Sequence, residues 1–140
     1  MFIGNIKKLT RENNNFRKVM FTAEYSQLVL MSIPKGEDIG EEIHHETDQI
    51  LVLVRGQAEA IVNNLAYDFG KHDVLFIPAG TKHNIINIGD EDLKLYTIYA
   101  LPEHPDGTVF KTKADSQKYE SEKKEELKRQ SANSMTKGDA

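Results

Sequence analysis

The chain has 140 residues, a length that fits one domain with a single core. Its formal net charge is −4, so it lacks the basic excess that binding to nucleic-acid phosphates requires, and no nucleic-acid partner is expected. It contains no cysteine, which excludes disulfides and cysteine-ligated zinc or iron–sulfur clusters and is consistent with a reducing compartment.

The sequence shows neither an export signal nor a membrane span. The first residues, MFIGNIKKLT, lack the apolar core of a signal peptide. The longest unbroken apolar run, residues 50–54, is far too short to cross a bilayer. We therefore expect a cytoplasmic protein without a membrane partner.

The pattern of apolar residues predicts a series of short strands after a short N-terminal helix. The amphipathic piece GNIKKLTREN comes first, and FRKVMFTAEYSQLVLMSIP then reads as two strands joined at residues 23–26. QILVLVRG is a strand that ends at Gly56, and QAEAIVNNLAYDFG is a hairpin that turns at Asn63 and Asn64. HDVLFIPAG, HNIINIGDED and LKLYTIYALP supply three more strands. Short strands at this spacing predict an all-β sandwich or barrel.

The last thirty residues differ in composition from the rest of the chain. From Lys111 onward there are eight Lys or Arg residues against six Asp or Glu. Thr112 and Asp115 form a weak capping box, which predicts a helix over part of residues 113–129. We therefore divide the chain into a β-barrel domain, 1–110, and a charged C-terminal helix or tail, 111–140.

Four polar residues have the spacing of a metal site. Glu42 and His44 are two residues apart, so on an extended strand both side chains leave the same face. Gln49 begins the next apolar strand, and His83 begins another strand about thirty residues later. If these strands are neighbours, two imidazoles, a carboxylate and an amide converge, a donor set suited to a mid-to-late first-row divalent metal.

At these residues the sequence resembles the cupin superfamily, over residues 30–105. The second cupin motif, P-x-G-x-x-H-x-x-x-N, is matched in full, although His72 stands where the motif has its leading glycine. The first motif is matched with two substitutions, because Glu42 replaces its first histidine and Gln49 replaces its glutamate. The matching residues are His44 and Gly56 in the first motif, and Pro78, Gly80, His83 and Asn87 in the second. The closing segment, with HPDGTV, is similar to a subgroup of single-domain cupins labelled mannose-6-phosphate isomerase-like.

The resemblance implies a jelly-roll barrel of six to eight strands with a metal near one mouth. Its ligands would be Glu42, His44 and His83, with Gln49 as the fourth or as the holder of a metal-bound water. Iron, manganese, nickel, cobalt and zinc all remain open. Glu41 competes with Glu42 as the carboxylate, whereas His45 and His72 are interpreted as surface residues.

The ligand of such a site is expected to be a small molecule. Candidate contacts are Tyr99, His104 and Arg55, although Arg55 also fits a surface charge at the end of a strand. One hypothesis is a metal-dependent isomerase or dioxygenase, for instance one acting on a sugar phosphate. The alternative is a non-catalytic module that binds a sugar or other small ligand, or a structural dimer. The resemblance also implies a homodimer, with residues 16–33 as the candidate interface.

Overall fold

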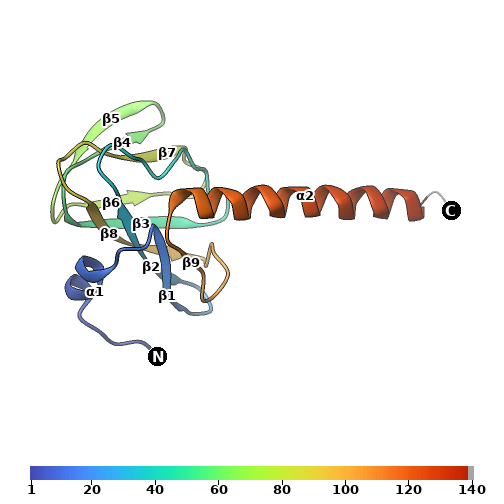
Figure 1. Cartoon of the computed structure of the whole chain (residues 1–140), viewed down its shortest axis with the longest axis horizontal. Helices are drawn as coiled ribbons and strands as arrows, with labels where there is room; N and C mark the ends of the chain where they lie inside the picture. Colours follow the sequence, from blue (N-terminus) through green and yellow to red (C-terminus); the bar gives the residue numbers. More distant parts are fainter. Residues whose placement is uncertain (139–140) are drawn as a thin grey trace.

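The computed structural model of the chain describes residues 1–138 and consists mainly of antiparallel strands. The elements are α1 (Ile6–Glu12), β1 (Arg17–Thr22), β2 (Gln27–Ile33), β3 (Asp48–Arg55), β4 (Ala58–Val62), β5 (Leu65–Phe69), β6 (Val74–Ile77), β7 (His83–Asn87), β8 (Leu93–Ala100), β9 (Val109–Phe110) and α2 (Lys113–Gly138). The strands form a two-layered barrel, and α2 extends away from one side of it (Figure 1). The predicted all-β fold with a helix near each end is confirmed. No helix in residues 1–138 is long and apolar enough to cross a membrane.

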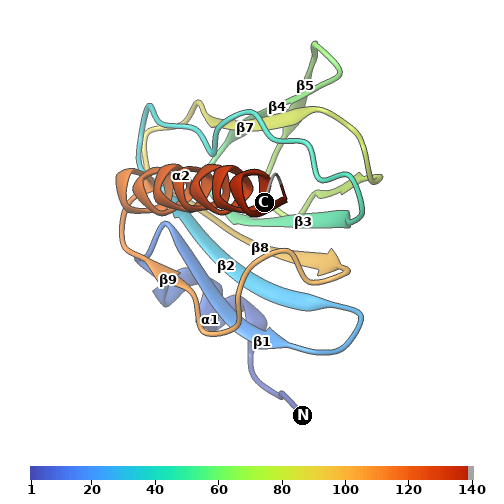
Figure 2. The same ribbon diagram turned by 90° about the vertical axis from the view of Figure 1, so that its right-hand side faces the viewer.

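Two sheets face each other across the core (Figure 2). The larger has the strand order β6-β3-β8-β2-β1-β9, and the smaller has the order β5-β4-β7. Isolated bridges from Asp38 to Ile86 and from Glu42 to His83 lay the loop before β3 alongside β7. Buried and more exposed side chains alternate most clearly along β3, β7 and β8, and the buried ones fill the space between the sheets.

Two predicted turns form as expected and set the geometry of their strands. Asn63 and Asn64 have φ values of 50° and 68°, the left-handed pair that a two-residue hairpin requires between β4 and β5. Gly80 has a φ of 81°, a conformation that glycine adopts readily, and the turn it makes after Pro78 leads into His83.

The structure differs from the expectations in strand number and helix length. The described residues form nine strands and not six to eight, the ninth being a two-residue strand that pairs with β1. The helix predicted within residues 113–129 extends to Gly138. It begins as predicted, since the Asp115 amide donates to Thr112 Oγ1 at 3.2 Å. Its first turn is then fixed to the barrel by an ion pair from Lys113 to Asp38.

Candidate metal centre

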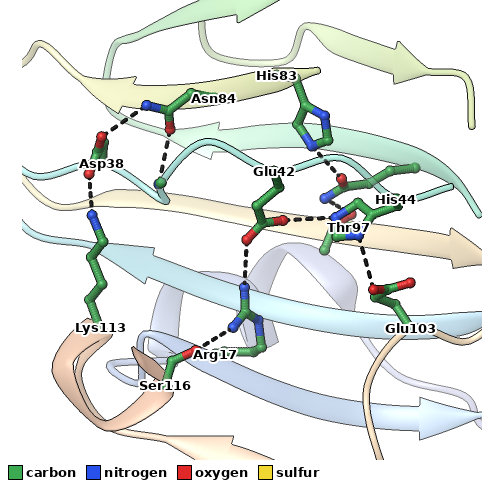
Figure 3. A network of polar contacts seen from close by, with 12 residues as sticks. Arg17, Asp38, Glu42, His44, His83, Asn84, Thr97, Glu103, Lys113 and Ser116 are labelled. Atoms are coloured by element: carbon green, nitrogen blue, oxygen red, sulfur yellow. Dashed lines mark hydrogen bonds and ion pairs between the residues drawn. The ribbon is translucent and has the colours of Figure 1, made fainter. Parts of the chain in front are cut away.

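Glu42, His44 and His83 come together where the two sheets meet at one end of the barrel (Figure 3). Glu42 lies beside β7, and its backbone exchanges two hydrogen bonds with His83, at 2.9 and 3.0 Å. His44 follows two residues later and points to the same side. One side-chain donor atom from each residue lies within 4.8 Å of the other two. The structure therefore assembles the predicted triad from two segments thirty-nine residues apart.

Each histidine of the triad has both ring nitrogens next to an oxygen. In His83, Nδ1 lies 2.9 Å from the Thr81 carbonyl and Nε2 lies 2.9 Å from Gln49 Oε1. In His44, Nδ1 lies 3.0 Å from Glu103 Oε1 and Nε2 lies 2.8 Å from Glu42 Oε2. A neutral imidazole carries one proton and can donate only once. With that proton on Nδ1, each Nε2 lone pair is left for a cation, the arrangement found in metal-ligating histidines.

In the metal-free protein, the neighbouring carboxylates keep His44 protonated at a nitrogen that could otherwise bind a metal. Burial lowers the pKa of His44, but hydrogen bonds to Glu103 and Glu42 outweigh it and raise the pKa to about 9. The pKa of Glu103 is lowered mainly by its hydrogen bond from His44. Burial raises the pKa of Glu42, yet His44 and the charge of Arg17 bring it below its usual value. A divalent ion at His44 Nε2 would replace the proton between this nitrogen and Glu42 Oε2.

Gln49 is held with its carbonyl oxygen toward His83. The side chain is buried, and its Nε2 donates to Thr97 Oγ1 and to Tyr99 Oη, both at 3.2 Å. These two bonds fix the amide so that Oε1 faces the triad. Two imidazole nitrogens, one carboxylate and one amide oxygen fit a mid-to-late first-row metal, and Oε1 is placed either to bind it or to hold a water on it.

Tyr99 and His104 lie next to the triad. The Tyr99 ring is fully buried between the rings of His44 and His104, with centroids 5.5 and 5.1 Å away. Burial raises the pKa of Tyr99, so its hydroxyl stays protonated. Burial also lowers the pKa of His104 to about 4, so the ring is neutral at physiological pH. His104 Nε2 is buried without a hydrogen-bond partner among the described residues.

Arg55 does not reach the triad. It lies six residues along β3 from Gln49, roughly 20 Å away at the rise of an extended strand. A β-bulge between Leu53 and Arg55 reverses the alternation that would have turned the side chain inward. Its guanidinium instead pairs on the surface with Glu91, at 2.8 Å.

Two further residues of the site were absent from the sequence-based set. Arg17 of β1 is only 2% exposed, and its guanidinium joins Glu42 Oε1, at 3.3 Å, to Ser116 Oγ of α2, at 2.8 Å. Its inward position could have been read from the alternation, because it shares a strand face with buried Val19. Glu103, the partner of His44, lies in a loop, where no alternation exists to place it.

Glu42 and His44 of the triad line a cavity of about 440 Å³, a size that suits a small ligand, whereas His83 is not among its lining residues. On the barrel side the cavity is lined by Glu42, His44, Glu103 and His104. On the opposite side it is lined by residues of α2. The mouth of the barrel is therefore shared between the sheets and the C-terminal helix.

Comparison with known proteins places this architecture in a family. The family model described as "Cupin domain" matches residues 29–99. The chain is 44% identical over 121 residues to the uncharacterized protein YrkC of Bacillus subtilis, an alignment that covers 82% of this chain and 65% of that protein. It is 38% identical over 113 residues to an uncharacterized protein of Acanthamoeba polyphaga mimivirus, covering 78% of this chain and 71% of that protein.

A solved structure supports the same assignment. The crystal structure of a protein from Bacillus halodurans superimposes with a TM-score of 0.82 at 41% identity, covering 83% of this chain and 92% of that one. Because the chain spans about 65% of the length of the Bacillus subtilis relative, the family likeness concerns the domain and not that whole protein. The match over residues 29–99 and the shared fold show that the chain belongs to the cupin family.

Proposed function

We propose that this cupin binds a divalent transition metal through Glu42, His44 and His83, with Gln49 completing the donor set. The observation that carries the proposal is the convergence of three donor atoms within 4.8 Å. Support comes from the Nδ1 atoms of both histidines, each of which faces an acceptor and leaves Nε2 for the metal. Iron, manganese, nickel, cobalt and zinc all suit this donor set.

The metal would in turn hold a small metabolite with oxygen donors in the adjoining cavity. A bound divalent ion would polarise a carbonyl or hydroxyl oxygen of that ligand or, if redox-active, support a reaction with oxygen. Isomerase chemistry needs an additional acid or base, and Glu103 and neutral His104 line the same cavity. The similarity of the closing segment to isomerase-like cupins makes a sugar phosphate one substrate to test. The alternative is a module that binds such a ligand without transforming it.

Elemental analysis tests the metal site directly. The purified protein is expected to hold about one equivalent of metal, and Glu42→Ala and His83→Ala are expected to lose it. His45→Ala is the matched control, because His45 is exposed and adjacent to His44. Circular dichroism serves to check that each variant is folded. Unchanged metal content in both site variants would refute the proposed ligand set.

A second measurement separates catalysis from binding. Oxygen consumption is followed with a panel of small acids and catechols, and isomerisation is followed with sugar phosphates. Turnover that disappears in His83→Ala, but not in His45→Ala, supports an enzyme. Saturable binding without turnover supports the non-catalytic alternative.

We also propose that the protein forms a homodimer, through a surface that differs from the segment expected at first. Residues 16–33 form β1 and β2, and both edges of β1 are already paired, with β2 and β9. The outer face of the large sheet instead carries a continuous apolar patch across β6, β3 and β8, where Val74 and Phe76 are 65% and 57% exposed. Cross-strand neighbours in this patch are Phe76, Ile50 and Ile98 in one row and Val74, Val52 and Tyr96 in the next. An apolar sheet face of this kind suits the same face of a second copy.

A further inference from the structure

The guanidinium of Arg17 connects the carboxylate of Glu42 to helix α2 (Figure 3). Its Nη2 donates to Glu42 Oε1 at 3.3 Å, and its Nη1 donates to Ser116 Oγ at 2.8 Å. Arg17 and Ser116 are 2% and 6% exposed, so the bridge lies inside the protein. A buried guanidinium is stable only when its charge is paired and its N–H groups are bonded. Arg17 therefore depends on both of these partners.

The two oxygens of Glu42 have different partners. Oε1 accepts from Arg17, whereas Oε2 lies 2.8 Å from His44 Nε2, the nitrogen that would bind the metal. An unrestrained glutamate side chain occupies many rotamers, and a charge-assisted hydrogen bond to one oxygen restricts where the other can lie. Arg17 thus holds Glu42 in the orientation that directs Oε2 to the triad.

The orientation of Arg17 depends in turn on α2. The guanidinium lies over the ring of Phe16, 5.2 Å from its centroid, and Nε has no hydrogen-bond partner within residues 1–138. The rotation of this planar group is therefore set by the acceptors of its terminal nitrogens, one of which is Ser116. Ser116 belongs to the first turns of α2, which the ion pair of Lys113 with Asp38 fixes to the barrel.

We propose that Arg17 is a positioning residue of the metal centre and that α2, by holding Arg17 through Ser116, raises the affinity of the triad for its metal. This inference rests on the proposed metal site. Because coupling between two binding events is reciprocal, metal binding should stabilise the docked start of α2 by the same factor. The C-terminal helix then contributes to the metal centre without supplying a ligand.

The charge of Arg17 alone would have a different effect. A cation beside the site repels a metal ion, so loss of the charge by itself would strengthen metal binding. Arg17→Lys keeps the charge but replaces the planar fork by a single ammonium group, which cannot hold Glu42 and Ser116 in the same geometry. A positioning role predicts weaker metal binding by this variant, whereas a role as a counter-charge predicts no change.

Titration of the full chain with cobalt tests the bridge from both ends. Arg17→Lys is expected to bind cobalt about tenfold more weakly, and Ser116→Ala about three- to tenfold more weakly. Arg55→Lys is the control for the first variant, because Arg55 pairs with Glu91 at the surface. Ser121→Ala is the control for the second, because Ser121 is exposed on the same helix. Both serine substitutions raise helix propensity alike, so only the loss of the acceptor distinguishes them.

Hydrogen exchange followed by mass spectrometry tests the reciprocal effect. In the unchanged protein, cobalt should slow the exchange of backbone amides in residues 116–121 about threefold or more. This slowing should be lost in Ser116→Ala and retained in Ser121→Ala. A serine that only stabilised the docked helix would alter exchange equally with and without cobalt, so the dependence on the metal separates the two roles.

The outcomes distinguish this inference from the proposed function. Cobalt affinity of Arg17→Lys or Ser116→Ala equal to that of the unchanged protein would overturn the positioning role while leaving the metal site intact. Equal effects of Ser116→Ala and Ser121→Ala, or exchange in α2 that does not respond to cobalt, would do the same. A chain that takes up no cobalt at all would overturn the metal site itself and this inference with it.

Discussion

A buried amide away from the triad holds the loop that supplies Glu103. Gln27, the first residue of β2, is 1% exposed, and its Nε2 donates to the His104 carbonyl at 2.7 Å and to Thr22 Oγ1 at 2.9 Å. Its Oε1 accepts from the backbone amides of His104, at 3.0 Å, and Glu103, at 3.3 Å. One side chain thus satisfies three backbone groups of the loop, much as a neighbouring strand would.

Replacing this residue by methionine is predicted to lower both stability and metal affinity. Gln27→Met keeps the length of the side chain but leaves two backbone N–H groups and one carbonyl without partners. At about 1 kcal/mol for each part-buried group, the free energy of unfolding should fall by roughly 3 kcal/mol. For a chain of this length that corresponds to a melting temperature lower by roughly 10 °C. Because Glu103 is then less well held against His44 Nδ1, metal affinity should fall about tenfold or more.

Urea denaturation and cobalt titration measure the two effects separately. Gln57→Met is the matched control, since Gln57 is exposed and the same substitution there should change the unfolding free energy by less than about 0.5 kcal/mol. Glu103→Gln retains the Gln27 hydrogen bonds but removes the charge that faces His44 Nδ1, so it should weaken cobalt binding and lower the unfolding free energy of the metal-free protein only at pH values where His44 is protonated. If Gln27→Met unfolds more easily yet binds cobalt as tightly as the unchanged protein, the loop does not position His44 and the reasoning fails at that step.

Three further predictions concern pH, the surface pair and the dimer. The folded-state pKa of His44, about 9, exceeds its usual 6.5, so its protonation stabilises the metal-free fold fully below about pH 6.5, and this is lost as pH rises through 9. Between these pH values the free energy of unfolding of the unchanged, metal-free protein should therefore fall by up to about 3 kcal/mol more than that of His44→Gln. Equal pH profiles of the two proteins in urea denaturation would contradict this. Arg55→Ala should lower the free energy of unfolding by less than about 1 kcal/mol and leave cobalt binding unchanged, because the ion pair of Arg55 with Glu91 is exposed. Loss of cobalt binding in this variant would contradict the placement of Arg55 away from the triad. Phe76→Glu should convert a dimer into a monomer by light scattering, and a monomeric unchanged protein would refute the dimer.

The sequence predicted the triad because its geometry depends on local rules. Alternation along an extended segment places Glu42 and His44 on one side, and the turn at Gly80 delivers His83 to the start of β7. The two-residue hairpin at Asn63 and Asn64 follows in the same way from residues that tolerate a positive φ. These features need only the identity of residues a few positions apart, whereas the meeting of His83 with Glu42 was expected from the resemblance to the two cupin motifs.

The remaining contacts could not be read from the sequence because they depend on how distant segments pack. Gln27 meets the Glu103 loop across seventy-six positions, and Arg17 reaches Ser116 across ninety-nine. The orientation of Arg55 depends on a bulge, and one extra residue reverses the face of every side chain after it. The position of α2 depends on the polar contacts of Lys113 and Ser116 and on the packing of Tyr119 against Phe110, which composition cannot reveal.

The triad lies at the end of the barrel where the inward-facing side chains of the strands are polar and not apolar. Near the triad these positions are polar, as at Gln49, Thr97 and His83, whereas deeper in the barrel they are occupied by Leu51, Leu53, Leu95, Leu93 and Ile85. The apolar interior excludes water beneath the triad and strengthens its electrostatic interactions. The cavity beside the triad lies at the mouth, where it is bordered by the Glu103 loop and α2. The selectivity of the proposed site would then depend on these segments outside the strands of the barrel.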